Sequence, residues 1–224
     1  MNFELIIQYY PILISGLKVT VYSCAGALFI GLTFGIILYQ LSESKFKAFR
    51  LGYKFYITIF RGTPLLVQVY LLFYGGPLFN LTLSAVQVGI FGMGFYVSAY
   101  FAEIYRSGFE SLAKGQVEAA RDLGFSKLQT LSYIQFPQML GLIIPPLTNQ
   151  SIILIKESAI LSIITVPEIS TAAIKMATET YSVVEPYVLL AGSYWVITYL
   201  ISILGKKAEQ KATQYLYINQ RETV

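Results

Sequence analysis

The sequence predicts an all-α integral membrane protein, and three observations carry that prediction. The chain has 224 residues, of which 55% are hydrophobic and only 12% charged, whereas a typical soluble domain is about 25% charged. Its uncharged stretches are long enough for helices that cross a bilayer, which takes about 20 mostly apolar residues. Its basic residues fall mainly in three short segments beside those stretches. We therefore expect a single transmembrane domain over residues 1–224.

Five spans are predicted from the gaps between charged residues. Residues 19–42 and 186–205 each form one uncharged run. The run 62–102 is too long for one span and suits two, with a turn near Pro77. The run 128–155 opens with polar residues, which we expect to lie outside the membrane. The expected spans are 15–41, 58–76, 84–105, 138–157 and 186–205.

The orientation follows from the positions of Lys and Arg, which favour the cytoplasmic side of a membrane. Segments 43–61, 103–127 and 206–224 hold 13 of the 16 basic residues. Five spans place these three segments on the same side, which should be the cytoplasm. The N-terminus is then expected outside and the C-terminus in the cytoplasm. Residues 1–17 carry no Lys or Arg, so no cleavable signal is expected and the first helix should stay in the membrane.

Two further segments have a predicted form, and composition excludes some chemistry. The outer segment 158–185 is expected to form short helices on the outer side, and the tail from Lys206 a short amphipathic, then frayed, end. Histidine is absent and Cys24 is the only cysteine. An intramolecular disulfide and a Cys-based zinc or iron–sulfur site are therefore excluded, so no metal site is expected.

The coupling loop 109–137 is the longest polar segment on the predicted cytoplasmic side. Glu118 to Leu123 is good helix-forming sequence, Gly124 suits a left-handed C-cap, and Ser126 can cap a following helix. Pro137 is expected to restart the chain at the membrane face. By residue chemistry alone, this helix-turn-helix is either a docking element for a partner or an ordinary solvated loop.

The residue spacing in this loop resembles the EAA motif of permease subunits from binding-protein-dependent ABC importers. The matching residues are Glu118, Ala119, Ala120, Gly124, Ile134, Phe136 and Pro137, with Phe136 standing where Leu is usual. The resemblance implies that the loop is a coupling helix that docks into an ATPase subunit. The residues expected to carry that role are Glu118, Ala119, Ala120, Arg121, Asp122 and Gly124.

Other segments resemble the polar amino acid uptake branch of that family, of the histidine, glutamine, arginine and cystine type. They are residues 15–20, 61–68, 102–108, 145–150 and 155–159. The resemblance implies a type I ABC importer permease fold in a bacterial cytoplasmic (inner) membrane. It also implies a second permease subunit (an identical copy or a close homologue), two ABC ATPase subunits, an extracytoplasmic amino-acid-binding protein and an amino acid substrate, with membrane lipid around the bundle and no nucleic acid.

The chain is not expected to be an enzyme. It contains no G-x-x-x-x-G-K-[ST] phosphate loop, so ATP and magnesium should be bound by the partner ATPase and no cofactor by this chain. Two rival functions stay open. One is a secondary amino acid transporter driven by an ion gradient, and the other is a structural or channel subunit. The sequence does not identify which amino acid is carried, nor whether the permease pair is a homodimer or a heterodimer.

Polar residues within the apolar runs are candidates for function, because such residues are costly in a membrane. Helix-stabilising or boundary roles remain alternatives for each of them. The candidates for the substrate path are Thr63, Gln68, Asn149, Gln150, Lys156, Glu157 and Ser158. Glu103 and Arg106 are spaced to pair on one helix, and together with Arg61 they are candidates for a gate or a structural ion pair.

Overall fold

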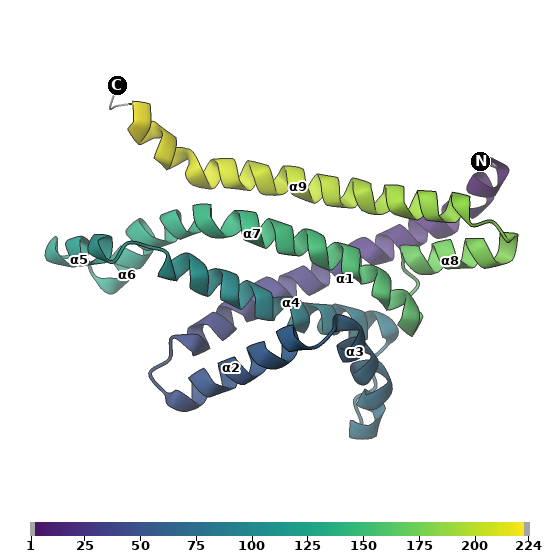
Figure 1. The fold of residues 1–224 in the computed structure, drawn as a ribbon, viewed down its shortest axis with the longest axis horizontal. Coiled ribbons are helices and arrows are strands. Elements are labelled where there is room, and N and C mark those ends of the chain that lie inside the picture. The colour runs from purple at the N-terminus through teal and green to yellow at the C-terminus, as the bar shows by residue number, and fades with distance from the viewer. Residues whose placement is uncertain (1–2, 222–224) are drawn as a thin grey trace.

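The fold is a bundle of long helices with short helices at both ends (Figure 1). The computed structural model describes residues 3–221, and this range contains no strand. The long helices are α1 (Phe3–Ser42), α2 (Lys47–Gly62), α4 (Ala85–Glu110), α7 (Phe136–Glu157) and α9 (Val184–Arg221). The short helices are α3 (Leu65–Tyr70), α5 (Lys114–Asp122), α6 (Lys127–Gln129) and α8 (Ile169–Thr180).

Four helical stretches are long and apolar enough to cross a membrane, and a bent pair can supply a fifth span. The four are 4–42, 85–110, 127–164 and 184–214. The bent pair joins Lys47–Gly62 to Leu65–Phe79 at an angle of 104°. The prediction of an all-helical protein with several candidate spans is confirmed, whereas the count of five and the side on which each terminus lies stay predictions.

The core forms where α1 crosses α4, which is the most extensive helix contact of the fold. Met93, Val97 and Phe101 of α4 are completely buried there. A Cβ atom at Gly35 of α1 would lie 3.0 Å from the Cβ of Phe101, so this glycine permits the close approach of the two helices. On the other side α7 packs along α9. Figure 1 shows α5 and α6 at one end of the bundle, with α8 and the N-terminus at the other.

The second predicted span, 58–76, is wrong as a continuous helix, because the chain breaks at Thr63 and Pro64. Thr63 is extended, with φ −121° and ψ 146°, since the ring of a following proline disfavours the helical conformation. Beyond the break, α3 continues through a π-helical turn (Leu71–Gly75) and a 3-10 turn (Gly76–Phe79). The chain therefore bends sharply inside the predicted span 58–76.

Two other predicted segments join longer helices. Pro137 lies in the first turn of α7, as expected, but helical structure runs from residue 127 to residue 164 through the π-helical stretch Thr130–Gln135. The tail from Lys206 continues α9 to Arg221, and its amphipathic, then frayed, character stays a prediction. The outer segment does consist of short helices, namely the 3-10 helix Ser158–Ile164 and α8.

Candidate functional site

The α5–α6 hairpin (residues 114–129) has its turn fixed by backbone hydrogen bonds. Gly124 adopts the left-handed conformation with φ +81°, as predicted. The N–H of Phe125 donates to the carbonyl of Ala120 at 3.0 Å, and the N–H of Gly124 donates to the carbonyl of Arg121 at 2.9 Å. This pair of bonds is a Schellman motif, which satisfies the last carbonyls of a helix. Ser126 then caps α6 in a reciprocal capping box with Gln129.

The charged residues of the hairpin are open to a partner, but one of its two alanines is not. Glu118, Arg121 and Asp122 are exposed, as is Ala119. Ala120 is only 3% exposed, so its small side chain fits against the chain's own helices. The expectation that both alanines face a docking partner is therefore corrected, because Ala120 packs inside the subunit.

The apolar residues at the tip of the hairpin were not identified from the sequence. Leu123 is 78% exposed and Leu128 is 72% exposed, and Tyr133 lies exposed on the next turn. Large apolar side chains in water, next to fixed charges, are typical of a protein-binding surface. The sequence did contain an indication of this apolar surface, because Leu123 and Leu128 stand on either side of Gly124 within a loop predicted to be polar.

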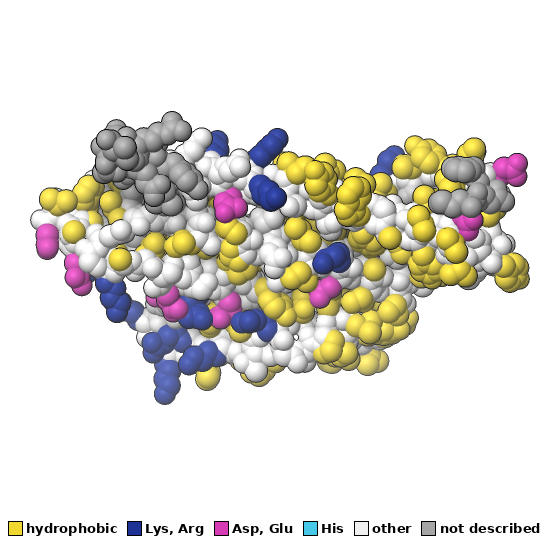
Figure 2. All heavy atoms as spheres, turned by 45° about the horizontal axis from the view of Figure 1, so that its top comes forward, with side chains coloured by type: hydrophobic (Ala, Val, Ile, Leu, Met, Phe, Trp, Pro, Cys, Tyr) yellow, Lys and Arg dark blue, Asp and Glu magenta, His cyan; other side chains and the backbone are white. Residues whose placement is uncertain are grey.

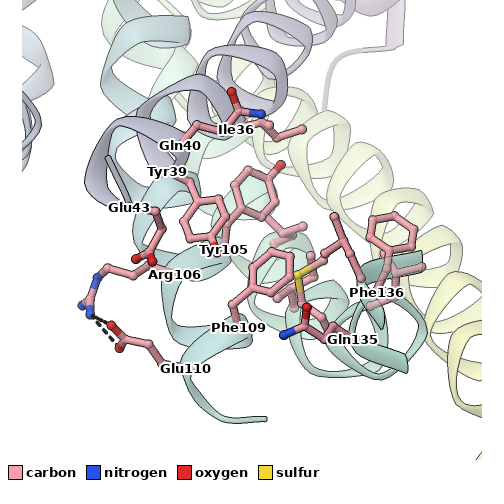
Figure 3. Close-up of a pocket in the computed structure, with 15 residues that line it drawn as sticks. Ile36, Tyr39, Gln40, Glu43, Tyr105, Arg106, Phe109, Glu110, Gln135 and Phe136 are labelled. Carbon is pink, nitrogen blue, oxygen red and sulfur yellow. Dashed lines mark hydrogen bonds and ion pairs between the residues drawn. The ribbon is translucent and has the colours of Figure 1, made fainter. Parts of the chain in front are cut away.

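A second cluster of charges joins α2 to α4. The Glu103 carboxylate accepts from Arg106 on its own helix, with Oε2 3.0 Å from Nη2, and lies 3.5 Å from Nη1 of Arg61 on α2. Tyr53 of α2 donates to the same carboxylate. Arg106 also binds Glu110 at 2.7 Å, as the dashed lines in Figure 3 show. The predicted gate or structural pair thus exists as one ion network, and Tyr53 is a member that the sequence analysis missed.

A cleft of about 700 Å³ opens beside this network, between α1, α4 and α7. Figure 3 shows Tyr39 and Phe109 side by side at its wall, and their stacked rings are 5.0 Å apart. Gln135 and Phe136 close it from the side of the coupling loop. The cleft is lined mainly by apolar and aromatic side chains, with charged groups at its rim, as ligand-binding clefts often are.

Thr63 and Gln68 lie on the two sides of the break between α2 and α3, and hydrogen bonds of Gln68 connect these sides. The Gln68 amide nitrogen donates to the hydroxyl of Thr63 at 2.8 Å and to the carbonyl of Phe60 at 3.1 Å. The bond to Phe60, and another to the carbonyl of Thr63 at 3.2 Å, satisfy backbone groups that the break at Pro64 leaves without helical partners. The amide nitrogen of Gln68 thus has a helix-stabilising role, which was one alternative to a place in the substrate path. Its buried Oε1 atom has no hydrogen-bond partner in the described residues.

The remaining substrate-path candidates lie on α7 and directly after it, and they differ in exposure. Ser158, the first residue of the following 3-10 helix, is buried and donates to the carbonyl of Ile155, and its place in a substrate path stays a prediction. Asn149 and Lys156 are exposed, and Gln150 and Glu157 are half-buried. Among the described side chains, residues 4–214, Lys156 and Glu157 form no ion pair within 4 Å, and the Oε2 atom of Glu157 is buried without a hydrogen-bond partner.

A buried carboxyl at the opposite end was not found from the sequence. Glu168 caps α8 and is 0% exposed. It accepts hydrogen bonds from the backbone of Thr171 at 3.0 Å, from Thr20 of α1 at 3.2 Å and from Tyr194 of α9 at 3.4 Å. Burial raises its pKa above the ordinary value. Its position in a turn gave no sign of burial, and within the part of the chain described no three metal-binding side chains cluster.

The basic segments gather toward the end of the molecule where α5 lies. Figure 2 shows a dense group of Lys and Arg side chains at that end, whereas broad apolar areas cover the opposite half of the same face. Exposed aromatic and aliphatic residues on α1 and α9 include Phe29, Trp195 and Tyr199. This distribution fits helices that contact lipid along their length and water at a charged end.

Comparisons with known proteins agree with this arrangement. The family described as binding-protein-dependent transport system inner membrane component matches residues 31–214. The probable amino-acid ABC transporter permease protein YckA of Bacillus subtilis (strain 168) is 34% identical over 215 residues, covering 96% of this chain and 95% of YckA. The arginine transport system permease protein ArtQ of the same organism is 31% identical over 212 residues, covering 94% and 97%.

Two solved structures share the fold. One chain from a crystal structure of an amino acid ABC transporter with histidines has a TM-score of 0.86 and 35% identity, covering 94% of this chain and 99% of that one. A chain of the MetNI methionine ABC transporter in an inward-facing conformation has a TM-score of 0.74 at 18% identity, covering 90% and 96%, and supports the fold alone. The protein is therefore a multi-pass membrane protein with a type I ABC permease fold, and it belongs to the amino-acid ABC transporter permeases of the binding-protein-dependent transport family.

Proposed function

We propose that this chain is the membrane subunit of an ATP-driven importer that carries a polar amino acid across the bacterial cytoplasmic membrane. An external binding protein delivers the amino acid to the end of the bundle that bears α8. Two ATPase subunits, which bind ATP and magnesium, dock on the α5–α6 hairpins of two paired permease subunits. ATP binding and hydrolysis then drive alternating access.

The α5–α6 hairpin is the single observation that carries this proposal. Its exposed charges, Glu118, Arg121 and Asp122, can set the register of a partner. Leu123 and Leu128 can supply the buried centre of the contact. The Schellman motif at Gly124 makes the hairpin a rigid unit, so that a movement of the ATPase reaches α4 and α7 without being lost in a flexible loop.

The amino acid is proposed to pass along α7. Glu157 can pair with the α-ammonium group and Lys156 with the α-carboxylate, because neither has an ion-pair partner among the described side chains of residues 4–214. Asn149 and Gln150, two turns earlier on the same helix, can bind a polar side chain. GlnP of Rickettsia conorii, a relative 34% identical over 213 residues, is named a putative glutamine permease, and ArtQ an arginine permease, so a polar amino acid is the proposed class.

Reconstitution with the ATPase and the binding protein tests this proposal. Glu118→Lys should abolish co-purification of the ATPase and binding-protein-stimulated ATP hydrolysis, because it reverses one of the charges that set the register of the docked partner. The matched control is Glu179→Lys, which reverses an exposed charge on α8 at the opposite end and should leave co-purification unchanged. Equal ATPase binding by Glu118→Lys and the parent protein would contradict the docking role.

An ion-gradient-driven transporter is the rival, and Glu157 is the observation that favours it, since an unpaired acid could carry a proton. Uptake into proteoliposomes separates the two. The proposal requires uptake that stops without ATP and persists when an uncoupler is added. Uptake that continues without ATP and collapses with the uncoupler would support the rival.

A further inference from the structure

The first two turns of α2 carry three basic side chains that the proposed function does not use. Lys47, Arg50 and Lys54 recur at i, i+3 and i+7, a spacing that places them on one helix face, and all three are exposed. We call these three residues the α2 basic stripe. They line a shallow hollow of about 340 Å³ together with Leu51.

The α2 basic stripe has no acidic partner in the described residues. None of its three side chains lies within 4 Å of a carboxylate. Glu43, Glu103 and Glu110 do line a neighbouring hollow that Arg50 and Lys54 also border. Glu103 and Glu110, however, are already bound by Arg106, and Glu103 also by Arg61. Glu43 is the one remaining acid of that hollow, so the stripe keeps a net positive charge that only an external anion can balance.

Apolar side chains stand directly beside these charges. Leu51 and Phe55 are 65% and 68% exposed, and helical geometry places them along one edge of the stripe. The opposite face of α2 is occupied, because Tyr53 and Tyr56 pack against α1 and α4. The exposed side of α2 thus has a cationic stripe and an adjoining apolar edge, and its opposite side is buried against other helices. Such a helix is suited to bind an amphiphile with an anionic head group.

The stripe follows directly after a candidate membrane span. The first candidate span ends at Ser42, and α2 begins at Lys47 after a short turn. The basic first turns of α2 are therefore held where the head groups of the adjacent leaflet lie, and Figure 2 shows Lys and Arg gathered at that end of the molecule.

We propose that α2 binds an anionic phospholipid of the surrounding bilayer. The phosphate lies in the hollow between Lys47, Arg50 and Lys54, and an acyl chain runs along Leu51 and Phe55. Phosphate oxygens form charge-assisted hydrogen bonds with Lys and Arg, and each basic residue near an anionic surface strengthens binding about fivefold. A zwitterionic lipid carries its own ammonium group and gains no such net attraction. This inference does not depend on the substrate or on the ATPase.

Native mass spectrometry of the full-length chain in detergent tests the proposal, with phosphatidylglycerol and phosphatidylcholine added at equal concentrations. The parent protein should retain phosphatidylglycerol in preference to phosphatidylcholine. The variant Lys47→Gln, Arg50→Gln, Lys54→Gln should lose most of that preference, by roughly a hundredfold if the three contributions add. The matched control Lys206→Gln, Lys207→Gln, Lys211→Gln removes the same charge from exposed positions on α9 and should keep the preference.

Other outcomes would overturn the proposal. An equal loss in both triple variants would show attraction by overall charge alone, and an unchanged preference in the α2 variant would exclude the stripe. Displacement of the lipid by inorganic phosphate would indicate a free-anion site, because phosphate gains nothing from Leu51 and Phe55. If the α2 variant keeps its lipid but no longer co-purifies with the ATPase, the stripe is a protein-docking surface. Thermal unfolding of each variant controls for misfolding, and these exposed substitutions should leave it unchanged.

Discussion

The carboxylate of Glu103 on α4 lies 3.5 Å from the guanidinium of Arg61 near the end of α2. Two residues after Arg61, the chain becomes extended and bends toward α3. Arg61 also stands over the ring of Tyr100, 5.2 Å from its centroid. The end of α2 is thus bound to α4 by an ion pair and a cation–π contact, directly before the 104° bend between α2 and α3.

Replacing Glu103 by Gln should destabilise the packing of α2 on α4. The substitution removes the charge that binds two arginines, in a side chain only 23% exposed. The expected loss in the free energy of unfolding is about 1–3 kcal/mol, because hydrogen bonds to charged groups contribute that much when partly buried. Unfolding of the detergent-solubilised chain, followed by circular dichroism, measures the change.

Glu110→Gln is the matched control for that prediction. Glu110 also binds Arg106, but its side chain is 59% exposed, so solvent screens the pair. The expected change is about 0.5 kcal/mol or less. Equal effects of the two substitutions would contradict the claim that the α2–α4 contact depends on Glu103.

Gly124→Ala should weaken ATPase docking more than it weakens folding of the bundle. The φ of +81° at Gly124 is in the left-handed region, which costs a residue with a side chain about 1–2 kcal/mol. A Cβ atom there would meet no other atom within 4 Å, so the cost is conformational alone. Binding-protein-stimulated ATP hydrolysis should fall severalfold, with little change in the unfolding of the isolated permease.

Gly115→Ala tests whether the conformation of Gly124 is the cause. Gly115 lies in α5 of the same hairpin, has a negative φ and also has open space around it. Alanine is favoured over glycine within a helix by about 1 kcal/mol. ATP hydrolysis should therefore stay unchanged. A loss as large as that of Gly124→Ala would point to crowding at the docking surface instead.

The turn of the hairpin could be predicted from the sequence because its determinants are local. Gly124 and Ser126 carry conformational preferences that act within one turn, and both have their predicted roles. The pairing of Glu103 with Arg106 is also local, since it needs only a helix and a spacing of three residues. Likewise, the long uncharged runs mark the apolar helices because transfer of charge into a membrane is costly.

The features that the sequence analysis missed depend on tertiary contacts. Ala120 turns inward and Leu123 outward because of how α5 sits on its neighbours, which helix periodicity does not specify. Glu168 is buried because Thr20 and Tyr194, on helices distant in the sequence, both reach it. Helical structure reaches Pro137 by way of a π-helical stretch, an adjustment that no residue preference indicates.

Gly108→Ala should destabilise the contact between α4 and α7. A Cβ atom at Gly108 would overlap the Ile143 side chain of α7 and approach Met139 at 3.2 Å, and both neighbours are buried. The expected cost of such overpacking is about 1–3 kcal/mol. Gly52→Ala on α2 is the control, because nothing lies within 4 Å of its Cβ position. The same unfolding measurement should show a loss only for Gly108→Ala.

The Glu168 carboxyl should make stability depend on pH. Its folded-state pKa is raised because the side chain is buried, and its described hydrogen-bond donors are uncharged. A group whose pKa is higher in the folded state contributes most stability below its unfolded-state pKa of about 4.3. That contribution is lost as the pH rises through the folded-state value. Glu168→Gln keeps a neutral group of the same shape and should remove this dependence.

Melting temperatures of the parent protein and of Glu168→Gln, measured in parallel from acidic to alkaline pH, check this prediction. Subtracting one curve from the other cancels the titration of all other groups. The stability of Glu168→Gln relative to the parent should increase as the pH rises and then level off above the raised pKa. A relative stability that falls with rising pH would mean that the ionised carboxylate is the favoured form, so that the hydrogen bonds from Thr20, Thr171 and Tyr194 outweigh the cost of burial.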